Sequence, residues 1–179
     1  MNSNESPCAT AYSRFAYLGI DNGFTGAVSC LLPDNRVFAR PVKFIDLGKE
    51  KLLDIEENRL MLREMIAAAG TTKDKVLVVY EQAQVMQKAG ARNNFTNGKN
   101  GEFWRVLLTL EQIPFMWVNP KDWQKQMFRG VRGDDTKVMA ALVRRQLFPE
   151  FDGSGHNRSQ MEGINDAILI AACARENRK

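Results

Sequence analysis

Four acidic side chains stand at positions from which they could converge on one point. Asp21 ends one apolar segment and Glu81 ends another, and each segment is typical of a buried strand. Glu162 and Asp166 are four residues apart in an amphipathic segment, a spacing that puts both on one face of a helix. Because neighbouring strands in a sheet lie about 4.8 Å apart, two strand ends and one helix could bring all four carboxylates together.

Such a cluster predicts a site for divalent cations. An oxygen-only ligand set suits Mg²⁺ or Mn²⁺ far better than Zn²⁺. Two ions about 3.5–4 Å apart favour in-line hydrolysis of a phosphodiester, because one activates a water while the other stabilises the leaving oxygen. Taken singly, each acid has a simpler alternative as a turn residue, a solvated strand end or a charge in the first turn of a helix. We expect two Mg²⁺ per site, replaceable by Mn²⁺, held by four catalytic acids: Asp21, Glu81, Glu162 and Asp166.

The basic residues are concentrated in one part of the chain. The formal net charge is only +4, from 25 Lys and Arg against 21 Asp and Glu. Residues 86–145 hold 11 of the basic and 5 of the acidic residues, whereas the rest of the chain holds 14 and 16. A local positive excess attracts phosphate, so it indicates an anionic partner such as a nucleic acid. The alternative is a solvated surface that happens to be basic.

The periodicity of apolar residues predicts the elements that must position the acids. Three consecutive strands joined by short turns should form an antiparallel meander, and a helix should then cross over to a fourth strand beside the first. Strands are expected at 15–21, 27–32, 37–45, 76–80 and 115–118, helices at 49–69, 102–112, 136–147 and 160–175, and a long loop at 82–101. Thr136 is the expected N-cap of its helix. The expected fold class is α/β: a mixed five-stranded sheet, three strands antiparallel and then parallel ones, with helices on both faces.

Length and composition limit the other possibilities. A chain of 179 residues corresponds to one domain, expected over 15–179 behind a flexible polar arm at 1–14. No apolar run approaches the roughly 20 residues that cross a bilayer, so no membrane association is expected. Three cysteines without a C-x-x-C pair predict neither a disulfide framework nor a zinc site, and they indicate a reducing, intracellular setting.

At these residues the sequence resembles the RuvC-type Holliday junction resolvases, a branch of the ribonuclease H-like nucleases, from about 15 to 175. LGIDNG around Asp21 looks like the first-strand motif of that family, and VVYEQ around Glu81 looks like its fourth-strand motif. VNPKDW (118–123), LFP (147–149) and EGINDAILIA (162–171) follow in the family's order. Bacterial members usually end with two Asp three residues apart, and Gly163 occupies the earlier place here. Phage and plastid members have acid-Gly-x-x-acid-Ala, typically Asp then Glu, and this chain has that pattern with the acids exchanged.

The resemblance implies a ribonuclease H-like fold and a homodimer that binds four-way DNA and nicks two strands symmetrically. It implies Mg²⁺-dependent endonuclease activity and a location in the cytoplasm of a bacterium or phage-infected host, with an organelle as the alternative. Rival functions keep the fold: a broader flap or branched-DNA nuclease, an RNA:DNA hybrid nuclease, or a catalytically inactive junction-binding module. An actin-like ATPase is disfavoured because the chain is too short for two such lobes.

Two groups of residues are expected to contact DNA. Basic side chains of the third quarter of the chain would neutralise phosphates; they are Lys121, Lys125, Arg129, Arg132 and Lys137. The loop at 82–101 would insert into an opened junction and contact bases through amide, cationic and aromatic side chains; the candidates are Gln84, Lys88, Arg92, Phe95 and Lys99. The alternative for this loop is a mobile surface segment. The tryptophans Trp104, Trp117 and Trp123 are expected in the core or at a dimer contact.

Overall fold

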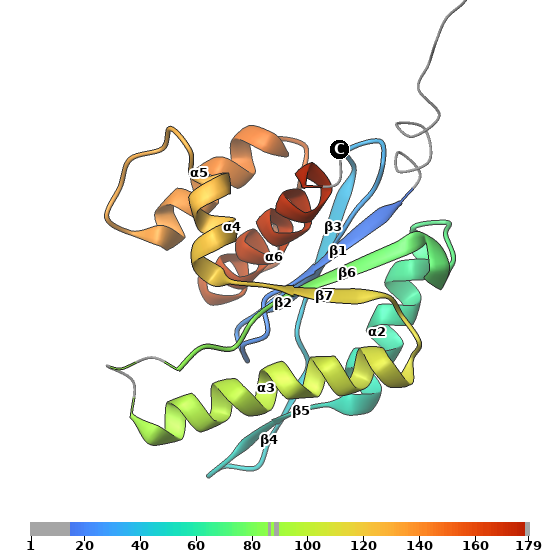
Figure 1. Ribbon diagram of the computed structural model, residues 1–179, viewed down its shortest axis with the longest axis vertical. Helices are drawn as coiled ribbons and strands as arrows, with labels where there is room; N and C mark the ends of the chain where they lie inside the picture. The colour runs from blue at the N-terminus through green and yellow to red at the C-terminus, as the bar shows by residue number, and fades with distance from the viewer. Residues whose placement is uncertain (1–14, 86, 88–89, 178–179) are drawn as a thin grey trace, which may run out of the picture.

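A five-stranded mixed sheet forms the centre of the protein (Figure 1). The computed structural model describes residues 15–85, 87 and 90–177, so the arm predicted at 1–14 and the candidate Lys88 lie outside the described residues. The strand order is β3-β2-β1-β6-β7. The strands are β1 (Ala16–Ile20), β2 (Ala27–Leu31), β3 (Val37–Pro41), β6 (Val76–Glu81) and β7 (Phe115–Val118). The first three are antiparallel, β6 and β7 continue parallel to β1, and the predicted fold class is therefore confirmed.

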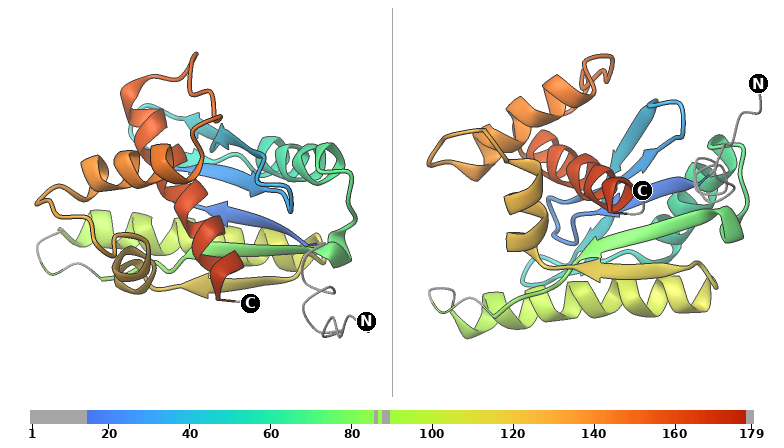
Figure 2. Two further views of the ribbon diagram at one scale, coloured as in Figure 1. Left: turned by 90° about the horizontal axis from the view of Figure 1, so that it is seen from above. Right: turned by 45° about the horizontal axis from the view of Figure 1, so that its top comes forward.

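Helices cover both faces of this sheet (Figure 2). One face carries α2 (Ile55–Ala68) and α3 (Ala91–Leu110), and the other carries α4 (Pro120–Met127), α5 (Thr136–Leu147) and α6 (Arg158–Glu176). Side chains of β1 alternate between the two faces of the sheet, so Leu18 packs in the α2–α3 core and Tyr17 packs in the α4–α6 core. Within the described part of the chain, no helix has the length and apolarity needed to cross a membrane.

The register of the two central strands sets two acids side by side. β1 and β6 pair in parallel with Ile20 opposite Tyr80, so Asp21 and Glu81 follow at adjacent strand ends. This pairing requires a crossover between the strands, and α2 provides it. The expectation that the fourth strand of the main sheet lies beside the first is confirmed.

Glycines let α6 pass unusually close to the strand that carries Asp21. A Cβ at Gly19 would stand 2.0 Å from the main-chain oxygen of Ala167, and a Cβ at Gly163 would stand 2.2 Å from that of Thr25. The hydroxyl of Ser29 also donates to the Ala167 oxygen at 2.8 Å. Any larger side chain at these two glycines would push the helix away. The glycines of the LGID and EGIND motifs therefore bring the acid of α6 against the end of β1.

Two boundaries differ from the prediction on the α2 side. The predicted third strand ends early, because Phe44–Asp46 (β4) turns away and pairs with Lys51–Leu53 (β5) in a separate hairpin. The predicted helix at 49–69 accordingly begins only at Ile55, after Asp54 caps it by accepting a hydrogen bond from the Glu57 amide. Apolar residues that suited a helical period belong to β5 instead.

Two other predictions were wrong at helix starts. The predicted loop at 82–101 is helical from Ala91 onward, although its Asn and Gly residues are poor helix formers. Contacts with the β4–β5 hairpin support this first half of α3, and buried Trp104 anchors the second half. The N-cap of α5 is Asp135 and not Thr136, because the Asp135 carboxylate accepts hydrogen bonds from the amides of Lys137 and Val138.

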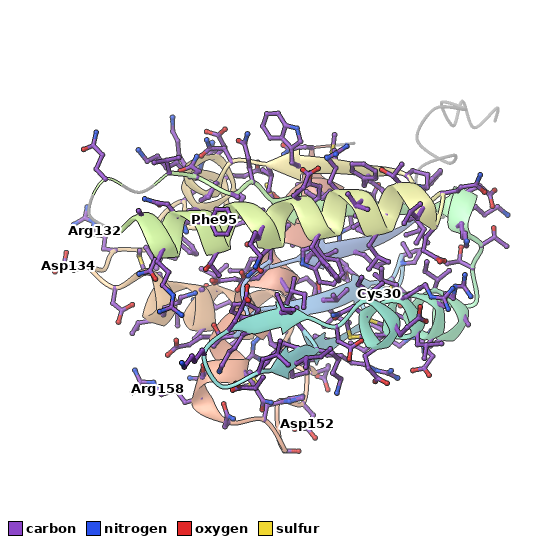
Figure 3. The ribbon with its side chains drawn as sticks, turned by 90° about the horizontal axis from the view of Figure 1, so that it is seen from below. Cys30, Phe95, Arg132, Asp134, Asp152 and Arg158 are labelled. Atoms are coloured by element: carbon purple, nitrogen blue, oxygen red, sulfur yellow. The ribbon has the colours of Figure 1, made fainter. Side chains whose placement is uncertain are left out.

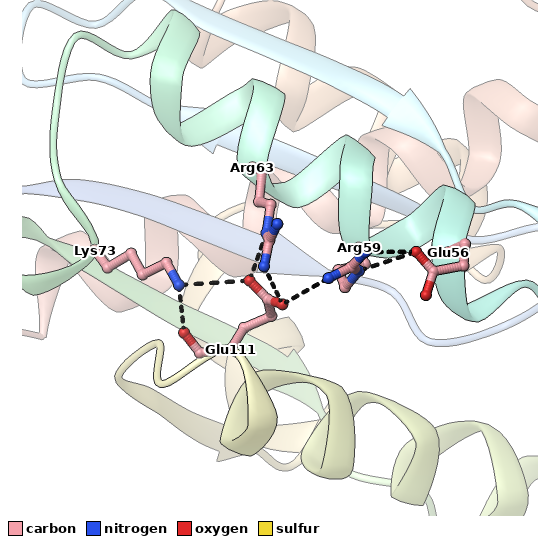
Figure 4. Close-up of polar contacts among 5 residues, drawn as sticks. All are labelled: Glu56, Arg59, Arg63, Lys73 and Glu111. Carbon is pink, nitrogen blue, oxygen red and sulfur yellow. Dashed lines mark hydrogen bonds and ion pairs between the residues drawn. The ribbon is translucent and has the colours of Figure 1, made fainter.

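A carboxylate ties the C-terminal end of α3 to α2 (Figure 4). The side chain of Glu111 is only 6% exposed, and both nitrogens of the Arg63 fork donate to it at 2.8 Å. Lys73 donates to the Glu111 main-chain oxygen at 2.7 Å, and Arg59 lies 3.8 Å from the carboxylate. Hydrogen bonds from Arg63 hold the pKa of Glu111 below its usual value, against the effect of burial. This cluster contains more cations than anions.

Candidate active site

Three of the four predicted acids gather at one end of the sheet. Asp21 directly follows β1, Glu81 ends β6, and Asp166 lies on α6, which packs across β1. The charges of Asp21 and Asp166 both raise the pKa of Glu81, so the three carboxylates act on one another electrostatically. The fourth acid, Glu162, lies one helical turn before Asp166 and raises its pKa. Its own carboxylate turns toward Arg158, 3.2 Å away.

Neutral donors hold the two acids at the strand ends. The main-chain amide of Gly23 donates to Oδ1 of Asp21 at 3.3 Å. Buried Asn22 donates from its side-chain amide to the main-chain oxygen of Glu81 at 2.7 Å, which fastens the loop after β1 to the end of β6. The indole N–H of Trp123 donates to Oε2 of Glu81 at 2.8 Å. Glu81 is thus fixed at both its backbone and its carboxylate.

Lys137 supplies the cation of the cluster, a role that sequence reasoning missed. It was expected to contact phosphate, yet its ammonium lies 2.5 Å from Oδ2 of Asp166, and its side chain is 45% exposed. Asp135 positions it by capping α5, and α5 packs along α6. A lysine two residues after an acid at a helix start is the only local signal. No local pattern indicates that α5 would place this lysine against Asp166.

Burial and mutual repulsion raise the proton affinity of the acids. Burial, followed by the charge of Asp21, raises the pKa of Glu81 to about 7, and the Trp123 hydrogen bond opposes this shift. Burial raises the pKa of Asp166 to about 6 even though Lys137 opposes the shift. Burial likewise raises the pKa of Asp21. For Lys137, burial lowers the pKa, but the nearby acids, Asp166 above all, outweigh it and the net pKa is raised. One lysine does not neutralise three carboxylates.

The donor chemistry of this cluster fits a hard divalent cation. All three convergent side chains offer oxygen. Burial first, and then repulsion between the acids, raises the pKa values of Glu81 and Asp166, and a divalent cation would offset the cost of ionising them. Among residues 15–85, 87 and 90–177, no three His, Cys, Asp or Glu side chains are already arranged around a common ion position. Lys137 instead occupies Oδ2 of Asp166. A cation at the acids would therefore have to share Asp166 with the lysine or displace it.

The residues predicted to insert into DNA lie mostly on a helix. Gln84 lies in the segment between β6 and α3, where its main-chain oxygen accepts from Asn97 at 3.1 Å. The other described candidates, Arg92, Phe95 and Lys99, project from the first half of α3. Figure 3 shows Phe95 there, with Arg132 and Asp134 of the loop before α5 at the same end of the molecule. The candidates are therefore held on a regular element and not on a loop tip.

A groove of about 570 Å³ separates this half of α3 from the β4–β5 hairpin. Arg92 donates to the main-chain oxygen of Lys49 at 2.7 Å, and Lys99 pairs with Glu50 at 2.6 Å while lying 5.6 Å from the Phe95 ring centroid. Phe24, three residues after Asp21, also lines the groove. The residues that line the groove include more cations than anions.

The remaining candidates for phosphate contacts do not form one surface. Lys121 is exposed in the first turn of α4, and Arg132 is exposed in the loop before α5. Lys125 and Arg129 line a separate hollow of about 490 Å³ with Glu176, at the C-terminal end of α6. Of the tryptophans, Trp104 and Trp123 are fully buried as expected, whereas Trp117 on the edge strand β7 is 57% exposed and does not belong to the core.

Comparison with known proteins gives matches at the level of three-dimensional structure. Neither a protein-family model nor a curated protein sequence matches the chain. RuvC from Thermus thermophilus aligns with a TM-score of 0.52 and 18% identity, over 92% of this chain and 96% of RuvC. The same protein in complex with a Holliday junction substrate gives a TM-score of 0.54, 15% identity and the same coverage.

A eukaryotic organelle protein gives a similar match. The yeast mitochondrial Holliday junction resolvase Ydc2 aligns with a TM-score of 0.56 and 12% identity, over 92% of this chain and 79% of that one. Identities this low carry information about the fold alone. The mixed sheet, its strand order and its helices on both faces agree with these matches. The chain therefore has the ribonuclease H-like fold of the RuvC-type Holliday junction resolvases.

Proposed function

We propose that this protein is a divalent-metal-dependent endonuclease that resolves four-way DNA junctions. The observation that carries the proposal is the cluster of Asp21, Glu81 and Asp166 with too little positive charge, at the strand ends of a RuvC-type fold. Perturbed carboxylates gathered at strand ends are typical of catalytic sites. The match to RuvC bound to a Holliday junction substrate supports branched DNA as the substrate class.

The three convergent acids would hold Mg²⁺, with Glu162 at the margin of the site. Mg²⁺ at this position supplies Lewis-acid chemistry: it offsets the carboxylate charges and stabilises the negative charge that develops on a phosphate. The chain's own residues prepare the site. Asn22 and Trp123 fix Glu81, and Lys137 balances part of the charge on Asp166 and donates a hydrogen bond there. The side chain of Lys137 is 45% exposed, so this lysine could also contact a phosphate oxygen.

Exposed cationic side chains support a path for DNA. In the groove between α3 and the β4–β5 hairpin, phosphates would meet Arg92 and Lys99 and a base would stack on Phe95. Lys121 and Arg132 are further exposed candidates for phosphate contacts. We expect Phe95→Ala to weaken junction binding several-fold, since a stacked base contributes about 1–3 kcal/mol. If junction affinity and cleavage position in gel assays were both unchanged, Phe95 would not contact the DNA.

Symmetric incision of two strands requires two active sites, so we propose a homodimer. α3 and the edge strand β7 offer exposed apolar side chains for such a contact: Val106, Leu110 and Trp117. Val106 and Leu110 are four residues apart and share one face of α3. Light scattering of the full chain would measure the mass directly, and a monomer that nicks only one strand of a junction would contradict the dimer.

A comparison of substrates tests the function. A synthetic four-way junction, a linear duplex, a flap and an RNA:DNA hybrid would each be incubated with Mg²⁺ or EDTA. We expect paired nicks at symmetric positions in the junction alone, dependent on Mg²⁺, with ends that a ligase can rejoin. Equal cleavage of flaps would favour a broader branched-DNA nuclease, and RNA-strand cleavage would favour a hybrid nuclease. Junction binding without cleavage by the wild type would favour an inactive binding module.

A further inference from the structure

The indole of Trp123 reaches the active-site carboxylate Glu81 because of how β7 leads into α4. β7 pairs in parallel with β6, with Val118 opposite Glu81, and the Gln82 amide donates to the Val118 oxygen at 2.8 Å. Asn119 then caps α4 by accepting from the Lys121 amide at 2.9 Å, and Pro120 begins the helix. The first turn of α4 therefore starts beside the last residue of β6. This geometry explains the VNPKDW motif, whose last residue donates to Glu81 Oε2 at 2.8 Å.

The donor in this contact is held rigidly. The Trp123 side chain has no exposed surface, and its ring meets that of Phe128 edge-on at a centroid separation of 5.7 Å, inside the α4–α6 core. An indole N–H only donates, so it can neither bind a cation nor take up a proton near neutral pH. It therefore differs from Lys137, which carries charge and is partly exposed. Trp123 can orient a carboxylate but cannot replace a metal ion there.

The other buried tryptophan provides an internal comparison. Trp104 is also fully buried, but its indole nitrogen has no hydrogen-bond partner among the described residues. It packs in the opposite core, against α2 and α3, beside Phe103. This fold therefore tolerates a buried indole N–H without a partner, so burial of the ring alone does not explain the bond from Trp123 to Glu81.

We propose that Trp123 is a positioning residue that occupies Oε2 of Glu81 and leaves Oε1 to face the divalent cation. The inference rests on the proposed Mg²⁺-dependent nuclease function. Its physical basis is that a partner which fixes a ligand's orientation strengthens metal binding without touching the metal, and removing such a partner costs roughly 10- to 100-fold in metal affinity or activity. The metal affinity of this site would thus depend on a side chain buried in the α4–α6 core.

Metal binding separates this role from simple packing. Trp123→Phe keeps an aromatic ring in the core but removes the N–H, and Trp104→Phe makes the same change in the other core as a matched control. Mn²⁺ binding would be measured by electron paramagnetic resonance on the full chain, with and without junction DNA. We expect Trp123→Phe to weaken Mn²⁺ binding roughly 10-fold and Trp104→Phe to leave it unchanged. Equal affinities in the wild type and both variants, or equal losses in both variants, would overturn the proposal.

Cleavage kinetics and one spectroscopic signal complete the test. The cleavage defect of Trp123→Phe should shrink as Mg²⁺ is raised, while junction affinity in EDTA stays that of the wild type. The ¹⁵N–¹H resonance of the Trp123 indole should move on Mg²⁺ addition to the wild type without DNA, and the Trp104 resonance should not. A defect that excess Mg²⁺ leaves unchanged, or a Trp123 resonance that stays in place, contradicts the positioning role. A wild type that neither binds Mn²⁺ nor cleaves would instead refute the proposed function itself.

Discussion

Glu111 and Glu81 are both glutamates in polar clusters, the first between α3 and α2 and the second at the end of β6, yet their pKa values move in opposite directions. Glu111 receives hydrogen bonds from Arg63 and Lys73, and these contacts lower its pKa. Glu81 is surrounded by two other acids and by a neutral indole donor, and burial followed by the Asp21 charge raises its pKa to about 7. Glu111 therefore has Arg59, Arg63 and Lys73 around its carboxylate, whereas the charge of Lys137 lowers the pKa of Glu81 too little to offset burial.

The difference separates a structural cluster from a functional one. A buried carboxylate with cationic partners ties elements together and needs nothing from outside, as Glu111 does for α2 and α3. The three acids beside Lys137 repel one another, which lowers the free energy of unfolding of the metal-free protein. Binding of external cations would raise that free energy again.

The largest expected effect is on catalysis. Asp166→Asn removes the acid between Lys137 and the other two carboxylates, and we expect cleavage of a four-way junction to fall roughly 10³-fold or more. Binding of the junction in EDTA should be retained, because phosphate contacts come from other residues. Glu111→Gln is the matched change in the cation-rich cluster and should leave the cleavage rate within about two-fold at temperatures where the variant is folded. Comparable losses of cleavage rate in both variants would contradict the assignment of one cluster to catalysis and the other to structure.

The second effect is on stability as a function of pH. The folded-state pKa values of Glu81 and Asp166, about 7 and about 6, lie above the ordinary values of these side chains, 4.5 and 3.8. The folded protein therefore binds more protons than the unfolded chain between these limits, and its stability falls as the pH rises through them. In EDTA we expect the free energy of unfolding to drop by on the order of 3 kcal/mol from about pH 5 to about pH 8.

Two controls accompany this pH measurement. Mg²⁺ should raise the midpoint of thermal unfolding more at about pH 8 than at about pH 5, because ionised carboxylates bind it better. Glu81→Gln, which cannot ionise, should flatten the EDTA curve. Glu111 contributes outside this window, since a lowered pKa gives stability that is lost only in acid, as the pH falls through its folded value. A flat wild-type curve, or equal Mg²⁺ effects at both pH values, would argue against an under-neutralised cluster.

The third effect tests the structural cluster. Glu111→Gln keeps the side-chain shape but removes the charge that Arg63 and Lys73 contact, and we expect a loss of about 2 kcal/mol in the free energy of unfolding. Chemical denaturation of the wild type and the variant would measure it. Glu102→Gln, on the exposed face of α3 where Glu102 pairs with Arg105, is the control and should cost little. Equal losses in the two variants would mean that the buried tie contributes no more than a surface pair.

The two clusters also differ in how far the sequence could predict them. Asp21 and Glu81 end apolar runs, so their place at strand ends follows from local pattern, and their adjacency follows from the handedness of the crossover. Asp166 could be predicted to share their site because its motif is recognisable. Glu111 could not be assigned a partner, because Arg63 lies 48 residues earlier on another helix.

The other contacts that the sequence could not predict also depend on residues that are distant along the chain. Lys137 reaches Asp166 only because α5 packs along α6, and Trp123 reaches Glu81 only because β7 sets the start of α4. The β4–β5 hairpin and the early start of α3 support each other through Arg92 and Lys99, which are distant in sequence from their partners. Each depends on tertiary contacts that override local propensity.

The smallest expected effect concerns Lys137, the cation that pairs with Asp166 in the catalytic cluster. Lys137 lowers the pKa of both Glu81 and Asp166, so Lys137→Met, which keeps the length of the side chain, should raise both further. If cleavage needs these acids ionised, its rate rises with pH, and the variant should reach half of its maximal rate at a pH higher by about one unit at low Mg²⁺. Lys121→Met, at the start of α4, should lower junction affinity without moving the pH midpoint. An unmoved midpoint for Lys137→Met would mean that Lys137 acts on the DNA phosphate alone, and the catalytic cluster would then depend on external cations for its entire charge balance.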